Sequence, residues 1–527
     1  MANDFTQYSA FQTLKELSLT PFDLTAPNAL TPERILNYQT TQCGFTFLYA
    51  TERVNEHTIK ALKELACQAN VHQKMVAMQQ GETINLIEGY ESERRSVLHT
   101  ATRDLFDHRI ESSKAKEATE KCKIELDKLR LFSEKMDVEN RFTDLIMVAI
   151  GGSELGPHAV YLGLEYLLKT NRNVHFVANV DPDDVASLIG KLNLKNTLVV
   201  IVSKAGTTLE TQTNEAFLRK EFKERGLTPA NHFVCVTGKG SPMDNPDNYL
   251  ECFYMYDWVG GRYSTTSMVG GVVLSFAFGF HVFLEFLKGA NAMDKNALKE
   301  DMQENLPLLG ALLSIWNHNF LHLPTLAIIP YSKALSRLSA HIQQVEMESN
   351  GKRIDKRGES VTFDTGMVIW GEPGTNAQHS FFQLIHQGTQ IIPLEFIAFK
   401  KSQNEEDFSF KETTSQQKLL SNVLAQMIAL AQGEKNENPN KTFLGNRPSH
   451  ILFAKQLDPF TMGALLAYYE HKVAFEGFIW GINSFDQEGV QLGKVLANKI
   501  LDRFKPDHEN KPAYPLADTI IHLINKL

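Results

Sequence analysis

Short apolar runs alternate with helix-forming segments through the first half of the chain. Residues 198–202 form an unbroken, β-branched apolar run, which is typical of a strand buried on both faces of a parallel sheet. Similar strands are predicted at residues 145–150, 174–180 and 232–236, with helices between them. Strands and helices that alternate at this spacing predict a parallel, doubly wound sheet.

The same alternation recurs in the second half of the chain. The strands predicted there are residues 325–330, 367–370, 390–399 and 450–453, again separated by helical patterns. Residues 1 to about 104 are mostly polar and predict a helical N-terminal segment. The predicted fold class is therefore α/β, with two doubly wound parallel-sheet domains that carry helical N-terminal and C-terminal extensions.

One stretch needs a separate interpretation. Residues 263–284 contain no Asp, Glu, Lys or Arg, and their length would just span a bilayer. Hydroxyl residues at positions 264–267, several glycines and His281 dilute this apolar character. The pattern therefore favours a helix buried in a large core.

Composition and charge narrow the class of protein. The 527 residues include 53 Lys plus Arg and 62 Asp plus Glu, for a formal charge of −9, and no basic block indicates a nucleic-acid partner. Five scattered cysteines fit neither a disulfide framework nor a zinc site, and no other metal-ligand spacing occurs. The N-terminus lacks the order of a signal peptide. We expect a cytoplasmic protein with no membrane segment and no metal.

A polar loop follows the strand at residues 198–202. This loop, Ser203-Lys-Ala-Gly-Thr-Thr208, comes just before helix-forming residues resume at Leu209. Free backbone N–H groups at a helix start, together with hydroxyls and a glycine, suit a phosphate. An ordinary strand-to-helix turn with Thr208 as N-cap is equally consistent with these residues.

Two glycine-containing segments add candidates. Gly151-Gly-Ser-Glu-Leu-Gly156 follows a strand, but it lacks the second glycine of the dinucleotide fingerprint, so we interpret it as a polar ligand loop. Arg262 follows two glycines in an otherwise uncharged neighbourhood. Such an arginine is either salt-bridged or directed at an anion.

Three further positions could carry acid–base chemistry. Glu348 is placed at the carboxyl end of a predicted helix, just before Asn-Gly, where it could act as a general base or simply face solvent. His379 is placed in the first turn of a predicted helix, which suits an acid–base group. Gln487 and Lys494 lie seven residues apart on one predicted helix face. The apolar neighbours of Lys494 suit either a partly buried ammonium or a snorkelling lysine.

Five stretches taken together resemble the glucose-6-phosphate isomerase family, and they occur in the family's order. They are residues 149–157, 260–264, 347–352, 371–379 and 483–494. The resemblance implies a small and a large domain, both of the sugar-isomerase type. We place the small domain at residues 105–285, the large domain at residues 1–104 plus 286–505, and a C-terminal arm at residues 506–527. The resemblance also implies a homodimer and an enzyme that needs no cofactor.

The resemblance also implies roles for individual residues. The 6-phosphate would lie in the loop that contains Ser203, Lys204, Ala205, Thr207 and Thr208. The residues implied to line the sugar are Gly152, Ser153 and Gln344. Glu348 would move the proton between C2 and C1, and Arg262 would steady the cis-enediolate. His379, borrowed from the partner subunit, and Lys494 would open the ring, with Gln487 nearby.

The implied reaction is the reversible conversion of glucose 6-phosphate and fructose 6-phosphate. A non-catalytic protein that senses sugar phosphates on the same fold is the alternative, although it would not need Glu348, Arg262, His379 and Lys494 together. Two departures from the family stand out. Ala205-Gly206 replaces a frequent Thr-Phe, and residues 265–267 replace a bulkier segment after Arg262.

Overall fold

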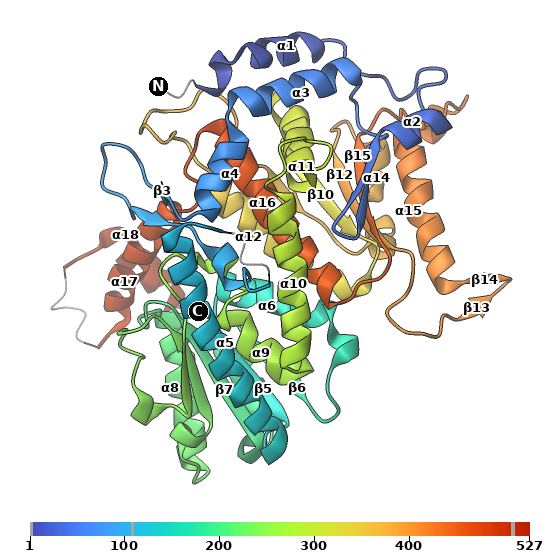
Figure 1. The fold of residues 1–527 in the computed structure, drawn as a ribbon. Helices are drawn as coiled ribbons and strands as arrows, with labels where there is room; N and C mark the ends of the chain where they lie inside the picture. The colour runs from blue at the N-terminus through green and yellow to red at the C-terminus, as the bar shows by residue number, and fades with distance from the viewer. Residues whose placement is uncertain (1–3, 107–109, 507–511) are drawn as a thin grey trace. The chain divides into compact units, whose positions relative to one another are not determined.

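The computed structural model describes residues 4–106, 110–506 and 512–527. The chain divides into two compact units, Met1–Ser484 and Phe485–Leu527. The first unit contains two parallel sheets and most of the helices (Figure 1). Its helices are α1 (Ser9–Leu17), α2 (Pro32–Asn37), α3 (Glu56–Gln68), α4 (Val71–Gln79), α5 (Ser113–Glu139), α6 (Gly152–Gly163), α7 (Pro182–Ile189), α8 (Leu209–Glu224), α9 (Met268–Phe278), α10 (Phe280–Asn296), α11 (Leu306–Ile315), α12 (Leu338–Asn350), α13 (Gly374–Gln378), α14 (Phe382–Gln387), α15 (Ser415–Gln432) and α16 (Pro459–Trp480).

The first sheet is entirely parallel. In sheet order its strands are β6 (Asn173–Val177), β5 (Asp144–Val148), β7 (Thr197–Ser203), β8 (Phe233–Thr237) and β9 (Glu251–Tyr254). Every residue of β7 and β8 is buried, as their continuous apolar pattern predicts for strands covered on both faces. The four predicted strands are confirmed, whereas the fifth strand, β9, was not predicted.

The second sheet combines parallel and antiparallel strands. In sheet order they are β1 (Gln39–Gln42), β2 (Phe45–Leu48), β15 (Ser449–Ala454), β12 (Leu394–Phe399), β10 (Thr325–Pro330) and β11 (Val368–Trp370). The last four are parallel, and β2 pairs antiparallel with β15. Two small hairpins, β3–β4 (Thr83–Asn85, Arg95–Ser96) and β13–β14 (Ser409–Phe410, Thr413–Thr414), complete the strands of the unit. The α/β class with parallel sheets is confirmed, but the N-terminal segment contributes strands that the prediction of a helical segment missed.

Helix α16 lies at the centre of the first unit, alongside α10 (Figure 1). Two glycines allow this close approach. A Cβ on Gly289 would lie 1.8 Å from the carbonyl oxygen of Phe460, and one on Gly463 would lie 1.9 Å from that of Phe286. Every residue of α16 from Thr461 onward is buried.

The charged residues within this buried core are paired. Arg103 Nη2 lies 2.6 Å from Asp294 Oδ1 on α10, and Arg103 Nη1 lies 2.7 Å from Glu470 Oε2 on α16. A buried charge without a partner is costly. The ion pairs therefore fix residue 103 to both helices.

Most of the uncharged stretch at residues 263–284 is buried, as predicted, but His281 is exposed and the stretch is not one helix. Helix α9 buries all of its residues, and α10 starts anew after Gly279, whose φ of +99° breaks the first helix. No helix in the described part of the chain is long and apolar enough to cross a membrane.

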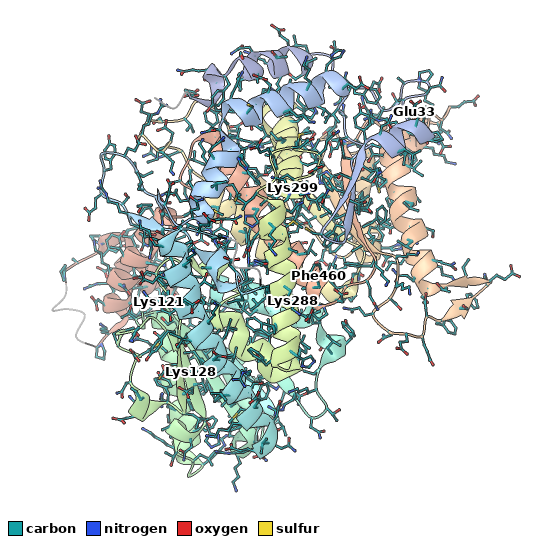
Figure 2. All side chains as sticks on the ribbon, in the orientation of Figure 1. Glu33, Lys121, Lys128, Lys288, Lys299 and Phe460 are labelled. Carbon is teal, nitrogen blue, oxygen red and sulfur yellow. The ribbon has the colours of Figure 1, made fainter. Side chains whose placement is uncertain are left out.

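Helix α5 lies against the first sheet and its neighbours. Lys121 and Lys128 are two of its labelled side chains (Figure 2). Lys128 Nζ lies 3.1 Å from Glu251 Oε1 on the edge strand β9. The charged face of this helix therefore serves partly to hold the sheet edge.

The second unit contains α17 (Gln491–Phe504) and α18 (Pro515–Ile524). The two helices contact each other, and Arg503 Nε lies 2.5 Å from Asp518 Oδ1. Part of the predicted arm at residues 506–527 lies outside the described residues. The predicted division of residues 1–505 into a small and a large domain stays a prediction, because contacts group residues 1–484 into one unit.

Candidate active site

The loop after β7 leaves the start of α8 without a side-chain cap. Gly206 has a φ of +67°, and a Cβ there would lie 3.0 Å from Ser241 Oγ and 3.1 Å from Met243 N. A larger residue at this position would therefore be strained and would crowd Ser241 and Met243. Thr208 is the N-cap of α8, but its side chain makes no capping hydrogen bond. Its Oγ1 instead lies 2.9 Å from Ser203 Oγ.

The sheet topology brings a second loop next to this one. Strand β5 pairs with β6 on one side and with β7 on the other, so the strand order reverses between β5 and β7. Ligands of open α/β sheets bind at such a switch point, beyond the carboxyl ends of the strands. Gly152 and Ser153, which begin α6 after β5, and the Ser203 loop both lie there.

Lys204 connects the loop after β7 to the segment that precedes Arg262. Its Nζ donates hydrogen bonds to the carbonyl oxygens of Asp257 and Val259, both at 3.0 Å. Burial, and next the positive charge of Arg95, lowers the pKa of Lys204 to about 8. The ammonium is therefore charged at neutral pH and loses its proton in mildly alkaline solution.

The start of α6 touches the arginine loop. A Cβ on Gly152 would lie 2.4 Å from Arg262 N and 2.5 Å from Gly261 O. Only a glycine permits this approach of α6 to the 3₁₀ turn η7 (Gly261–Tyr263). The predicted sugar-lining residue Gly152 and the predicted cation Arg262 are therefore close neighbours.

Helix α12 brings Glu348 to the same place. Arg262 Nη1 lies 3.6 Å from Glu348 Oε1, which is an ion pair rather than a close hydrogen bond. Gln344, one turn earlier on α12, donates a hydrogen bond of 2.7 Å from Nε2 to Glu348 Oε2. A Cβ on Gly151 would lie 3.3 Å from the same Gln344 Nε2. One carboxylate oxygen is thus held by an amide, while the other faces the guanidinium.

The guanidinium of Arg262 is almost entirely buried, with 2% of the residue exposed. Its Nη2 donates to the carbonyl oxygen of Ser484 at 2.6 Å. In contrast, 18% of the Glu348 side chain is exposed. In this arrangement the partly accessible carboxylate can remove a proton next to a carbonyl group. The fixed, buried guanidinium can stabilise the resulting oxyanion.

The placement predicted for His379 is wrong. Helix α13 ends at Gln378, and His379 is its exposed C-cap, not a residue in a first helical turn. Ala377 and Phe382 both belong to the core under the second sheet. Residues five positions apart do not share a helix face, so the chain breaks between α13 and α14 to bury both.

The common helix face predicted for Gln487 and Lys494 is also wrong. Gln487 precedes the 3₁₀ turn η11 (Glu488–Val490), and α17 begins only at Gln491. Lys494 is exposed, and α17 has no buried residue, so the partly buried ammonium is not observed. Both residues belong to the second unit, and their roles stay predictions.

Comparison with known proteins identifies the family. Residues 48–515 match the phosphoglucose isomerase family. The chain belongs to this family. A glucose-6-phosphate isomerase from Protochlamydia amoebophila is 60% identical over 501 residues, covering 95% of this chain and 93% of that protein. One from Chlamydia pneumoniae is 51% identical over 522 residues, covering 99% of this chain and 98% of that protein. The crystal structure of a glucose-6-phosphate isomerase from Chlamydia trachomatis matches with a TM-score of 0.95 and 48% identity, covering 99% of each chain.

Sequence reasoning missed several contacts that shape the site of this phosphoglucose isomerase family member. Ser349 Oγ accepts a hydrogen bond of 2.6 Å from Arg262 Nε, and Lys352 Nζ donates to the carbonyl oxygen of Glu348 at 2.8 Å. Both residues lie in the 347–352 stretch that carried the family resemblance. Their proximity to Glu348 in sequence was visible, but the direction of their side chains was not.

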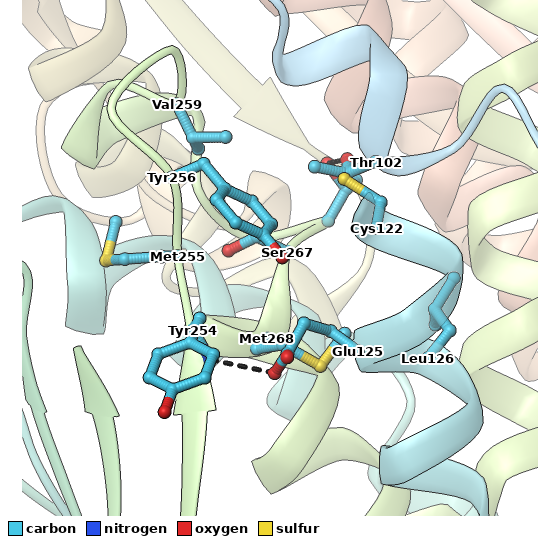
Figure 3. Close-up of a pocket in the computed structure, with 11 residues that line it drawn as sticks. Thr102, Cys122, Glu125, Leu126, Tyr254, Met255, Tyr256, Val259, Ser267 and Met268 are labelled. Carbon is cyan, nitrogen blue, oxygen red and sulfur yellow. Dashed lines mark hydrogen bonds between the residues drawn. The ribbon is translucent and has the colours of Figure 1, made fainter. Parts of the chain in front are cut away.

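A small cavity lies between α5 and residues 254–268 (Figure 3). Its lining includes Thr102, Cys122, Tyr256, Val259 and Thr266, and Tyr254 N donates to Glu125 Oε2 at 2.8 Å at one side. The cavity has a volume of about 10 Å³, which is space for a single water. It is therefore too small for a sugar phosphate and belongs to the packing between these segments.

Proposed function

We propose that this protein catalyses the reversible isomerisation of D-glucose 6-phosphate and D-fructose 6-phosphate by ring opening and cis-enediolate proton transfer. The observation that carries the proposal is the ion pair of 3.6 Å between Glu348 and the buried Arg262, next to an open polar loop at the carboxyl ends of β5 and β7. The names of the relatives, which are glucose-6-phosphate isomerases, support the choice of substrate.

The proposed proton transfer uses Glu348 as the base. The carboxylate takes the proton from C2 of the open-chain aldose and returns it to C1, and Arg262 stabilises the negative charge that develops on the enediolate. A positioned base contributes about 10²–10⁴-fold to such a step. The hydrogen bond from Gln344 to Oε2 orients the carboxylate, so Oε1 is the oxygen that we assign to proton transfer.

We assign phosphate binding to the loop after β7. Ser203, Lys204, Ala205, Thr207 and Thr208 surround the start of α8, where backbone N–H groups and the helix dipole favour an anion. Gly152, Ser153 and Gln344 would contact the sugar. The uncapped start of α8 supports this assignment over an ordinary turn.

We assign ring opening to His379 and Lys494, with Gln487 nearby, and we propose that the protein is a homodimer in which His379 comes from the second subunit. His379 is exposed on its own chain, and its imidazole has no hydrogen bond or ion pair with the described residues. An exposed histidine in this position suits a site completed by a second copy. The expected setting is the cytoplasm, in glycolysis and gluconeogenesis, and the five free cysteines suit a reducing compartment. We expect no cofactor and no metal.

The first experiment measures fructose 6-phosphate formation from glucose 6-phosphate by wild type and by Glu348→Gln. The variant keeps the shape of the side chain but cannot accept the proton, so we expect kcat to fall about 10²–10⁴-fold with sugar-phosphate binding retained. Glu359→Gln is the matched control, because Glu359 is an exposed glutamate that pairs with Arg357. It should keep wild-type kinetics.

Two outcomes would redirect the proposal. A wild type that binds the sugar phosphate without converting it would point to the sensing protein instead. Equal kcat in wild type and Glu348→Gln would keep the reaction but remove Glu348 as its base.

Mixing two inactive variants tests the shared histidine. In a dimer of Glu348→Gln with His379→Ala, one site would combine the intact Glu348 with the intact His379. A statistical mixture should then regain about a quarter of wild-type activity, because half of its dimers are mixed and each has one complete site. Mixing that restores no activity would show that each subunit uses its own His379.

A further inference from the structure

Arg262 is held by a hydroxyl group that none of the proposed roles uses. Its Nε donates to Ser349 Oγ at 2.6 Å, and Tyr263 Oη lies 2.8 Å from the same oxygen. We propose that Ser349 and Tyr263 are positioning residues that hold the Arg262 guanidinium in the orientation that stabilises the enediolate. This inference rests on the isomerase function proposed above.

Two anchors fix the plane of the guanidinium. Ser349 accepts from Nε, and the carbonyl oxygen of Ser484 accepts from Nη2 at 2.6 Å. Because the guanidinium is a rigid planar fork, these two contacts determine the direction of the third nitrogen, Nη1. That nitrogen is the one 3.6 Å from Glu348 Oε1. Losing the Ser349 contact would remove the anchor at Nε and loosen the orientation of the plane.

The hydroxyl groups of Ser349 and Tyr263 are shielded from solvent. Ser349 is 0% exposed and Tyr263 is 1% exposed, so neither hydroxyl exchanges its partner for bulk water. Hydrogen bonds to a charged group are stronger than neutral ones, and low local polarity strengthens them further. Burial raises the pKa of Tyr263, so its phenol keeps its proton at neutral pH and can hydrogen-bond with Ser349 Oγ.

The ring of Tyr263 is anchored independently of its hydroxyl. It stacks on His99, with ring centroids 4.8 Å apart and an angle of 20° between the planes. Burial, and next the charge of Arg103, lowers the pKa of His99 well below its usual value, so His99 is a neutral platform. Replacing Tyr263 by phenylalanine should therefore remove the hydroxyl while leaving the ring in place.

The arrangement couples two short segments across the site. Arg262 and Tyr263 are neighbours in η7, and Glu348 and Ser349 are neighbours in α12. Ser349 contacts both Arg262 and Tyr263, so the hydroxyl fixes the position of the cation relative to the base on the adjacent residue. A misplacement of about 1 Å at such a site can cost about 100-fold in rate.

The test compares Ser349→Ala, Tyr263→Phe and the double variant. Ser349→Ala should lower kcat about 10–100-fold with KM nearly unchanged, because the guanidinium acts on charge that develops only in the transition state. Tyr263→Phe should lower kcat about threefold to tenfold, the worth of one neutral hydrogen bond. The effects of the two substitutions should add only in part, because the Tyr263 and Ser349 hydroxyls contact each other and both residues contact Arg262.

Ser339→Ala is the matched control. Ser339 is a buried serine of the same helix, 3% exposed, and its Oγ donates to the backbone carbonyl of Ile328 at 3.1 Å. Its loss affects packing but not the arginine, so kcat should stay near that of wild type. A second measurement compares two inhibitors: Ser349→Ala should weaken a hydroxamate that mimics the enediolate and leave a linear polyol phosphate unaffected.

Three results would overturn the proposal. They are a kcat for Ser349→Ala equal to that of Ser339→Ala, equal weakening of both inhibitors, and additive effects of Ser349→Ala and Tyr263→Phe. An inactive wild type would instead refute the isomerase function itself, so the two failures are distinguishable.

Discussion

The parallel strands of the two sheets are connected in the same order, but the loops at equivalent positions differ in how their polar groups are satisfied. In the first sheet β5 lies between β6 and β7, and in the second β10 lies between β11 and β12. The loop after β12 therefore corresponds to the loop after β7. Each begins with a lysine directly after the strand, Lys204 and Lys400, and each leads to a helix with a threonine N-cap, Thr208 and Thr414.

The starts of α8 and α15 differ in which groups accept hydrogen bonds from their backbone N–H groups. Thr414 accepts a hydrogen bond of 3.2 Å from Gln417 N, and Gln417 Oε1 accepts one of 2.9 Å from Thr414 N. The carboxylate of Asp407 accepts from Gln416 N at 3.2 Å. The chain thus supplies its own anion and cap to α15, while Thr208 makes no capping bond to α8. The sheet topology therefore places a helix start that could bind an anion after each of β7 and β12. The side chains of Thr414 and Asp407 already satisfy the start of α15.

The second sheet instead positions residues with proposed roles in the reaction. Helix α12 follows β10 and brings Gln344 and Glu348 to the arginine loop, whereas α6 follows β5 and brings Gly152 and Ser153. The first sheet therefore positions most of the proposed binding groups, and the second positions the proposed base. The following variants test this division.

The largest expected difference separates the two lysines. Lys204→Met should raise KM for both sugar phosphates about 10–100-fold, because a charge-assisted contact to phosphate is lost, with a smaller effect on kcat. Lys400→Met, at the equivalent position after β12, should leave KM unchanged. Steady-state kinetics with both substrates measure the contrast, and equal KM values for the two variants would contradict the assigned phosphate loop.

The pH dependence should sharpen the same contrast. Lys204 has a lowered pKa of about 8, so its charge is present below pH 8 and is lost as the pH rises through that value. The phosphate is already a dianion there. We expect kcat/KM, which reports the free enzyme, to fall by roughly tenfold between pH 8 and pH 9.5. Lys204→Met should lack this fall, and a fall that persists in the variant would assign it to another group.

The smallest expected effect separates the two N-caps. Thr414→Ala should lower the free energy of unfolding by about 1 kcal/mol, the usual cost of a lost cap, without changing KM. Thr208→Ala should change the free energy of unfolding much less but raise KM by a few-fold, about the worth of one hydrogen bond. Chemical denaturation and steady-state kinetics on both variants test the reversal, which would be contradicted if Thr208→Ala were the less stable protein.

Strands buried on both faces were predictable because their pattern is local. Residues 198–202 consist only of β-branched residues and leucine, and no other environment accommodates such a run as well. The hairpin β1–β2 was missed because β1 is polar, Gln39-Thr-Thr-Gln42. Only its pairing through β2 with β15, some 400 residues further along the chain, makes it part of a sheet.

In the candidate site, too, features set by neighbouring residues were predictable, whereas features set by packing of distant segments were not. The sequence by itself determined the two parallel sheets, the polar loop after β7, the position of Glu348 at the end of a helix and the family. The sheets, the loop and the helix end each depend on residue types within a few positions of one another, and the family depends on five short stretches taken in order. Only the tertiary structure decided that Ser349 supports Arg262, that His379 is an exposed C-cap, and that the loop after β12 is closed by Asp407. Those outcomes depend on side-chain directions and on packing between distant segments, which a local pattern does not specify.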